Sequence, residues 1–196
     1  MEHIKDFIEK ATALRERGLS VGQIADELNI SKETATWLLT RPERVETPLK
    51  DISVNWSAIG KSALRLSLIA SALSDLLMEV VDEEVDVVVG ISLSGVPLGA
   101  LVAEDIGCDF SIYIPKKQVE RGGEIGAFSR NFSEVEGRKC LIVDDVITSG
   151  TTITETTNAL INLKAKPLAI GVMIDKEDIK EIYGIPVVSL LKVTPL

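Results

Sequence analysis

One stretch decides the fold of this 196-residue chain: Cys140-Leu141-Ile142-Val143-Asp144-Asp145-Val146-Ile147-Thr148-Ser149-Gly150-Thr151-Thr152. It begins as a short apolar run, which is typical of a strand buried on both faces of a parallel sheet. Two adjacent acids, Asp144 and Asp145, then end the run, and a group of small residues comes after them. The stretch therefore predicts a buried strand, a turn and the start of a helix.

The turn after the two acids is suited to bind a phosphate group. Hydroxyls and unhindered backbone N–H groups gather there, from Thr148, Ser149, Gly150, Thr151 and Thr152. The start of a helix carries unpaired N–H donors and partial positive charge, which attract an anion. Asp144 and Asp145 repel a phosphate, but carboxylates accept hydrogen bonds from ribose hydroxyls and bind divalent metals.

A buried strand, a helix cap and two solvated aspartates would also explain these residues without a ligand. However, four apolar residues, two acids, a spacer and Gly-Thr-Thr together resemble the phosphoribosyl-pyrophosphate (PRPP) signature of type I phosphoribosyltransferases. The resemblance implies that Asp144 and Asp145 hold the ribose or Mg²⁺, and that residues 148–152 hold the 5′-phosphate. No Lys follows the glycine and no Gly-x-Gly-x-x-Gly occurs, which disfavours a P-loop and a dinucleotide site.

A second strand and turn offer another place for an anion. An apolar run at 85–89 leads into a Gly- and Ser-containing loop, and a helix is expected to follow to about Ile106, ended by Gly107. In the family this loop holds the pyrophosphate, a role that passes to Ser92, Leu93, Ser94 and Gly95. Two phosphate-binding loops at the carboxyl edge of one sheet suit a ligand with phosphate at both ends.

Strand and helix alternate from Val85 onward, which predicts an α/β fold with a parallel sheet and helices on both faces. The remaining expected strands are 108–114, 168–174 and 187–191, with a helix at 153–163. Upstream, 51–56 alternates like a strand and 57–80 has helical spacing. The resemblance covers about residues 52–192, implies the type I phosphoribosyltransferase fold, and places Trp56 and Ile59 near a nucleobase.

The stretch 115–136 has no sustained periodicity, and a loop this long inside a compact domain is usually functional. It occupies the place of the mobile catalytic loop of orotate phosphoribosyltransferases, which typically carry Arg-Lys-x-x-Lys-x-His-Gly. Lys116 and Gly122 match that pattern, whereas Val119 and Arg121 stand in place of the second Lys and the His. The mobile-loop candidates are Lys116, Lys117 and Arg121. We assign no catalytic residue, because this departure favours PRPP binding over catalysis.

The chain before residue 49 predicts a small all-α domain. Apolar residues at helical spacing run from Ile4 to Arg17, Ser20 and Gln23 form a capping box, and Ser31 caps a third helix that reaches about Thr40. This arrangement resembles a helix-turn-helix, which presents the start of its last helix to the major groove of duplex DNA. A three-helix packing module without a nucleic-acid role is the alternative. The expected domains are 1–48 and 49–196.

The DNA-binding candidates lie on the third helix and just after it: Ser31, Lys32, Glu33, Thr36, Arg41 and Arg44. Trp37 is expected to pack under a neighbouring segment. Since only three of the candidates are basic, binding is expected to need two copies, in a homodimer or a higher homo-oligomer. The net charge of −9 argues against non-specific nucleic-acid binding by the whole surface.

Composition excludes several classes of protein. The single histidine, His3, cannot anchor a metal cluster or a Ser-His-Asp triad. No apolar run reaches the roughly 18 residues of a membrane span, and the N-terminus lacks a signal-peptide pattern. Cys108 and Cys140 lie in apolar, strand-like settings, so we expect buried free thiols and a cytoplasmic location.

Two functions fit these observations. The first is a DNA-binding transcriptional regulator that senses PRPP or a related phosphoribosyl metabolite, similar to archaeal orotate-phosphoribosyltransferase-like regulators and, by architecture, to the bacterial purine repressor. The second is an active orotate-type or other nucleobase phosphoribosyltransferase, a pentosyltransferase that uses PRPP and Mg²⁺. The coincidence of a DNA-binding motif with an incomplete catalytic loop favours the regulator.

Overall fold

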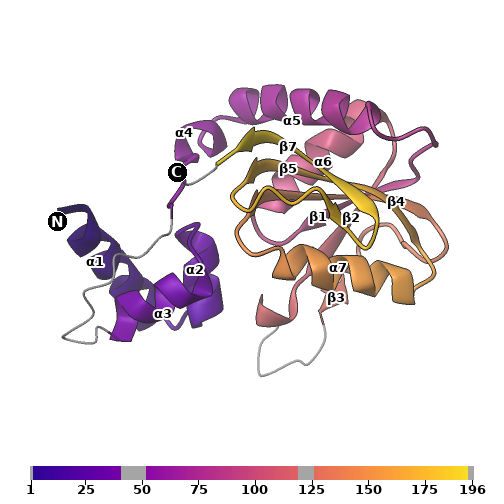
Figure 1. Ribbon diagram of the computed structural model, residues 1–196. Helices are drawn as coiled ribbons and strands as arrows, with labels where there is room; N and C mark the ends of the chain where they lie inside the picture. The colour runs from indigo at the N-terminus through magenta and orange to yellow at the C-terminus, as the bar shows by residue number, and fades with distance from the viewer. Residues whose placement is uncertain (1, 41–51, 119–125, 194–196) are drawn as a thin grey trace. The chain divides into compact units, whose positions relative to one another are not determined.

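The computed structural model describes residues 2–40, 52–118 and 126–193 (Figure 1). The chain divides into two compact units, the first ending at Asn55 and the second beginning at Trp56. The domain boundary predicted between residues 48 and 49 lies outside the described residues. Each unit is described by itself.

The first unit consists of three helices, α1 (Glu2–Glu16), α2 (Val21–Glu27) and α3 (Lys32–Thr40). Local side-chain hydrogen bonds fix where α2 and α3 begin. Ser20 Oγ accepts from the backbone N of Gln23 at 3.3 Å and Gln23 Oε1 accepts from the backbone N of Ser20 at 2.8 Å, which confirms the predicted capping box. Ser31 Oγ accepts from the backbone N of Thr34 at 3.1 Å and caps α3 as expected.

The core of the first unit is small and apolar. Its buried members are Ala11, Ile24, Ala25, Ile30, Ala35 and Leu38. Three of these residues are alanines, whose small side chains allow helices to pack closely. Because α3 turns its apolar side toward this core, Lys32, Glu33 and Thr36 remain exposed.

The second unit is a seven-stranded sheet in the order β3-β2-β1-β4-β5-β7-β6. Helices α5 and α6 cover one face and α7 covers the other (Figure 1). The elements are α4 Ser57–Gly60, α5 Ala63–Met78, β1 Val87–Ile91, α6 Gly95–Ile106, β2 Asp109–Ile114, η1 Lys116–Gln118, β3 Ala127–Phe128, β4 Lys139–Ile147, α7 Thr151–Asn162, β5 Lys166–Asp175, β6 Glu181–Ile182 and β7 Ile185–Lys192.

The five central strands β2, β1, β4, β5 and β7 are parallel, which confirms the predicted doubly covered sheet. The two-residue edge strands β3 and β6 pair antiparallel and were not expected from the sequence. A segment this short has no periodicity of its own, so only its neighbour defines it as a strand.

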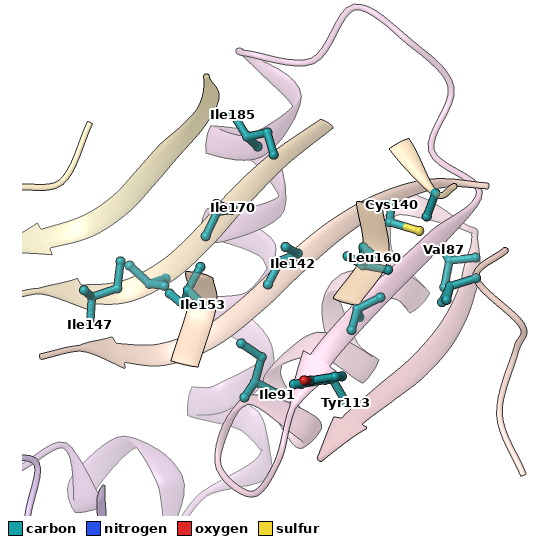
Figure 2. Packing of buried hydrophobic residues seen from close by; sticks show 14 residues of the cluster. Val87, Ile91, Tyr113, Cys140, Ile142, Ile147, Ile153, Leu160, Ile170 and Ile185 are labelled. Atoms are coloured by element: carbon teal, nitrogen blue, oxygen red, sulfur yellow. The ribbon is translucent and has the colours of Figure 1, made fainter. Parts of the chain in front are cut away.

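One hydrophobic core of the second unit lies between the sheet and α7 (Figure 2). Ile142 and Ile170 from the sheet and Leu160 from α7 are fully buried in it. Cys140 belongs to the same cluster, and burial raises the pKa of its thiol to about 12. Both cysteines are free; Cys140 is buried as expected, whereas Cys108 is only partly buried.

Two expectations upstream of the sheet are wrong. Residues 52–56 form no strand, because this segment is bonded to the end of α2 and the turn after it. Asn29 Nδ2 donates to Val54 O, and Ser53 Oγ donates to Leu28 O, each at 3.1 Å. The single helix expected at 57–80 is divided into α4 and α5. Ser62 causes the division, since its Oγ accepts from the backbone N of Arg65 and starts a new helix.

The strand that contains the two acids is longer than its apolar run. β4 continues through Asp144 and Asp145 to Ile147, because β5 runs beside it as far as the Ile147–Asp175 pair. β1 is likewise displaced from 85–89 to Val87–Ile91. Pairing with a neighbouring strand, and not hydrophobicity, sets both ends.

Helix α6 crosses β1 at two glycines. A Cβ on Gly99 would lie 3.0 Å from Gly90 Cα and 3.2 Å from Phe110 Cε2, and a Cβ on Gly90 would lie 2.9 Å from Gly95 O. Neither position has room for a side chain. The close crossing holds the loop between β1 and α6 against the sheet.

We expect Gly99→Val to destabilise the protein by about 1–3 kcal/mol, because the added side chain must push α6 away from β1. Urea unfolding measures the change. Glu104→Ala, on the exposed surface of the same helix, is the control and should change stability by no more than about 0.5 kcal/mol. Equal midpoints for wild type and Gly99→Val would contradict the close crossing.

Candidate functional site

The two candidate phosphate loops lie at the same edge of the sheet. β1 and β4 are adjacent and parallel, with Gly90 paired to Val143. The loop after β1 and the turn after β4 therefore both leave the carboxyl edge of the sheet, where ligands of open α/β sheets bind. The structure thus brings together Ser92, Leu93, Ser94 and Gly95 with the acids and the 148–152 turn.

The loop after β1 is packed against the end of β4. A Cβ on Gly95 would lie 2.7 Å from Val143 O and 2.9 Å from Asp144 Oδ1, so only glycine fits at the start of α6. The Ser92–Leu93 peptide bond is cis. The Leu93 side chain is 74% exposed, which leaves the tip of the loop open to solvent.

The turn after β4 is held open by Gly150. This residue has φ +69°, a left-handed conformation that favours glycine, and it directly precedes α7. Because the cap residue is a glycine, it has no side chain that could bond to the first turn of α7. Ser149 Oγ and Thr151 Oγ1 lie 3.0 Å apart and present two hydroxyls there.

A second contact fixes the turn from behind. A Cβ on Gly150 would lie 2.9 Å from Ile179 Cδ1. Ile179 belongs to a turn that the fully buried Asp175 organises, since Asp175 Oδ1 accepts from the backbone N of Glu177 and Oδ2 from the backbone N of Ile179, each at 2.9 Å. The sequence analysis missed Asp175, because a single acid at a strand end carries no motif.

The two neighbouring acids near the end of β4 are shielded from solvent to different degrees. Asp145 is only 7% exposed, and its Oδ2 accepts a hydrogen bond from Trp56 Nε1 at 2.9 Å. Asp144 keeps some solvent exposure, and its Oδ1 accepts from the backbone N of Asp145 at 2.9 Å. Desolvation, followed by repulsion from the Asp145 carboxylate, raises the pKa of Asp144 well above its ordinary value.

The short helix η1 is bonded to both candidate phosphate loops. Lys117 Nζ donates to Thr152 Oγ1 at 2.8 Å, and Gln118 Nε2 donates to Ser92 O at 2.7 Å. Its start is held by Glu155 of α7, whose Oε1 accepts from the backbone N of Lys116 at 2.8 Å. Of the mobile-loop candidates, Lys116 and Lys117 are thus placed at the site, whereas Arg121 lies outside the described residues.

Gln118 and Glu155 were not singled out from the sequence. Their partners lie 26 and 39 positions away in the chain, and neither residue belongs to a motif. Glu155 also accepts from the Tyr113 hydroxyl at 2.9 Å. Together these bonds tie β2, η1 and α7 into one framework around the site.

Chemically, the site has hydrogen-bond donors at both ends and carboxylates between them. It suits a ligand with an anion at each end and hydroxyls in the middle. Across the described residues, no group of three or more His, Cys, Asp or Glu side chains is placed to hold a metal ion. In the same part of the chain, no helix has the length and apolar character needed to cross a membrane.

The candidate DNA-binding residues lie at the start of α3. Lys32, Glu33 and Thr36 are exposed, and Ser31 is partly buried because its hydroxyl caps the helix. Thr36 Oγ1 donates to Lys32 O at 2.8 Å. Arg41 and Arg44 lie outside the described residues. Trp37 packs against the core of the first unit as expected.

Comparison with known sequences gives matches along nearly the whole chain. The family model of the phosphoribosyl transferase domain matches residues 55–191. The transcriptional regulator GfcR of Methanothrix thermoacetophila is 52% identical over 199 residues, which cover 98% of each chain. The transcriptional regulator GfcR of Halobacterium salinarum is 43% identical over 205 residues, covering 98% of this chain and 96% of that protein.

Solved structures share the fold of the second unit at low sequence identity. Orotate phosphoribosyltransferase from Mycobacterium tuberculosis, in complex with PRPP, superposes with a TM-score of 0.56 at 19% identity, over 71% of this chain and 80% of that chain. Adenine phosphoribosyltransferase from Thermoanaerobacter pseudethanolicus gives a TM-score of 0.60 at 18% identity, over 76% and 91%. These similarities confirm the type I phosphoribosyltransferase fold.

The raised pKa of Asp144 makes a testable contribution to stability. The folded state holds this proton more tightly than the unfolded state, so stability is lost as pH rises from about 3.9, the ordinary carboxyl pKa, through the raised folded value. Asp144→Asn removes this loss. We expect the variant to have a higher Tm than wild type at pH 7 and no advantage at pH 3.

Scanning calorimetry between pH 3 and 8 measures the effect. Asp75→Asn, at an exposed position of α5, is the control for loss of one negative charge and should follow the wild-type profile. An Asp144→Asn variant that is less stable than wild type at pH 7 would show that the carboxylate is satisfied in the folded protein.

Proposed function

The chain belongs to the phosphoribosyl transferase domain family, and we propose that it is a DNA-binding transcriptional regulator whose phosphoribosyltransferase-like unit senses PRPP or a related phosphoribosyl metabolite. The main support is the combination of a three-helix unit with this domain in a chain whose relatives, matched at 52% and 43% identity, are named transcriptional regulators. Because those matches span both units, the whole architecture is shared with the relatives.

The ligand side of the proposal uses the loops at the sheet edge. We assign residues 92–95 to the pyrophosphate, residues 148–152 to the 5′-phosphate, and Asp144 and Asp145 to the ribose hydroxyls. The close approach of Gly95 to β4, the glycine cap of α7 and the carboxylates of the acid pair support this order. Since Lys117 lies against Thr152, we assign its charge to the 5′-phosphate end.

Mg²⁺ fits the same site as a partner of PRPP. The ion binds proteins through one or two carboxylates and takes its other ligands from phosphate oxygens and water. Asp144 and Asp145 supply the carboxylates, and within the described residues no larger cluster of protein ligands is available. We therefore propose that Mg²⁺ enters together with PRPP.

The DNA side uses the exposed start of α3. We assign Ser31, Lys32, Glu33 and Thr36 to a major groove, with Arg41 and Arg44 as further phosphate contacts. Because only three of these residues are basic, we expect two copies of the chain to bind together on two half-sites. We expect this regulator to work in the cytoplasm, where its DNA is accessible.

An active nucleobase phosphoribosyltransferase is the second candidate, because the family fold and both phosphate loops are present. The sequence differences at Val119 and Arg121 count against it. Incubation with PRPP, Mg²⁺ and orotate, uracil or a purine base separates the two. Pyrophosphate release at ordinary enzymatic turnover would establish the transferase.

We expect Asp145→Asn to weaken PRPP binding about 10- to 100-fold, because hydrogen bonds to a charged acceptor are stronger than those to an amide. Isothermal titration calorimetry with Mg²⁺ present measures the affinity. Asp75→Asn again removes one carboxylate far from the sheet edge and serves as the control. An unchanged affinity for Asp145→Asn would contradict the ribose assignment.

We expect specific binding to duplex DNA from upstream of the protein's own gene, weakening steeply as salt increases. Lys32→Ala should lower the slope of log K against log salt by about 1. Lys10→Ala, which removes a lysine paired with Asp6 on α1, should leave that slope unchanged. Fluorescence anisotropy measures both, and absence of binding at low salt would contradict a DNA-binding role.

A further inference from the structure

Trp56 connects the candidate ligand site to the end of the first unit. Its indole Nε1 donates to Asp145 Oδ2 at 2.9 Å, although the residues are 89 positions apart. Trp56 is also the first residue of the second unit. The acceptor is a member of the acid pair to which we assign the ribose.

The chain just before Trp56 is bound to the first unit. Asn29 Nδ2 donates to Val54 O, and Ser53 Oγ donates to Leu28 O, each at 3.1 Å. Only Asn55 separates these anchors from Trp56. Trp56 therefore lies one residue from backbone that is bonded to the helices of the first unit.

The position of the indole is defined by packing as well as by its hydrogen bond. A Cβ on Gly60 would lie 2.6 Å from Trp56 Cζ3, so the ring occupies the space that a side chain on α4 would need. The backbone N of Ile59 and the backbone N of Gly60 both donate to Trp56 O, at 2.8 and 3.2 Å. The ring thus has a defined resting place beside α4.

We propose that Trp56 is a positioning residue that couples occupancy of the ligand site to DNA binding. Asp145 is 7% exposed, so a ribose hydroxyl gains access to this carboxylate only if a group that covers it withdraws. The Trp56 indole N–H is a side-chain donor bonded to it. Bound ligand displaces Trp56, and the displacement changes the segment 53–56 that the helical unit holds.

This coupling rests on the proposed function, and it predicts a quantity that can be measured. The factor by which PRPP changes DNA affinity must equal the factor by which DNA changes PRPP affinity. Trp56→Phe keeps an aromatic ring beside Gly60 but removes the donor. We expect the variant to bind PRPP about tenfold more tightly than wild type, because no competing donor remains, and to lose the coupling.

The experiment uses the full chain labelled with 5-fluorotryptophan. The chain has two tryptophans, Trp37 and Trp56. Trp56→Phe assigns the two ¹⁹F signals. Titration with PRPP and Mg²⁺ should move the Trp56 signal. Trp37→Phe is the matched control, because Trp37 Nε1 is buried without a hydrogen-bond partner among the described atoms. This control should keep the wild-type affinity for PRPP.

A second variant, Gly60→Ala, keeps the indole N–H but forces the ring away from its resting place. It should also tighten PRPP binding and reduce the coupling, so the test does not depend on Trp56→Phe alone. Anisotropy with and without saturating PRPP gives the coupling factor for each variant.

The outcomes separate the two proposals. Wild type that binds no PRPP overturns the sensing function and the coupling with it. The role of Trp56 is overturned if PRPP binds wild type and Trp56→Phe with equal affinity. It is also overturned if both Trp56→Phe and Gly60→Ala keep the coupling factor of wild type. Either result leaves the sensing function intact. Tighter PRPP binding together with loss of coupling in both variants supports the role of Trp56.

Discussion

The parallel pairing of β1 with β4 is the constraint on which the site depends. It makes the loops after the two strands leave the sheet at one edge, although their sequences lie about fifty residues apart. Gly90, Gly95 and Gly99 allow α6 to approach both strands closely. Without these hydrogen bonds and glycines, the loops would be separate turns, neither of which makes a binding site alone.

Much of this arrangement was predictable because its signals are local. The apolar run before Asp144 identified the central strand, and the Ser20–Gln23 capping box identified the start of α2. Two small-residue turns after predicted parallel strands are enough to place both at one edge. Local chemistry thus predicted the class of fold and the two loops that share one edge of the sheet.

The parts that sequence could not predict depend on distant partners. Residues 52–56 alternate like a strand but bind Leu28 and Asn29 instead of a sheet. β4 runs past its two acids because β5 supports it. The bonds from Gln118 to Ser92 and from Trp56 to Asp145 join segments that share no motif. Each of these features depends on tertiary contacts, which the local sequence pattern does not contain.

The contact between Gly150 and Ile179 gives the phosphate turn a rear wall built by a different part of the chain. That wall stands on Asp175, a carboxylate sealed from solvent at the end of β5. The bulk of the side chain at position 179 therefore governs how far the turn can recede. A substitution there would therefore change the conformation of the turn without altering any residue of the turn itself.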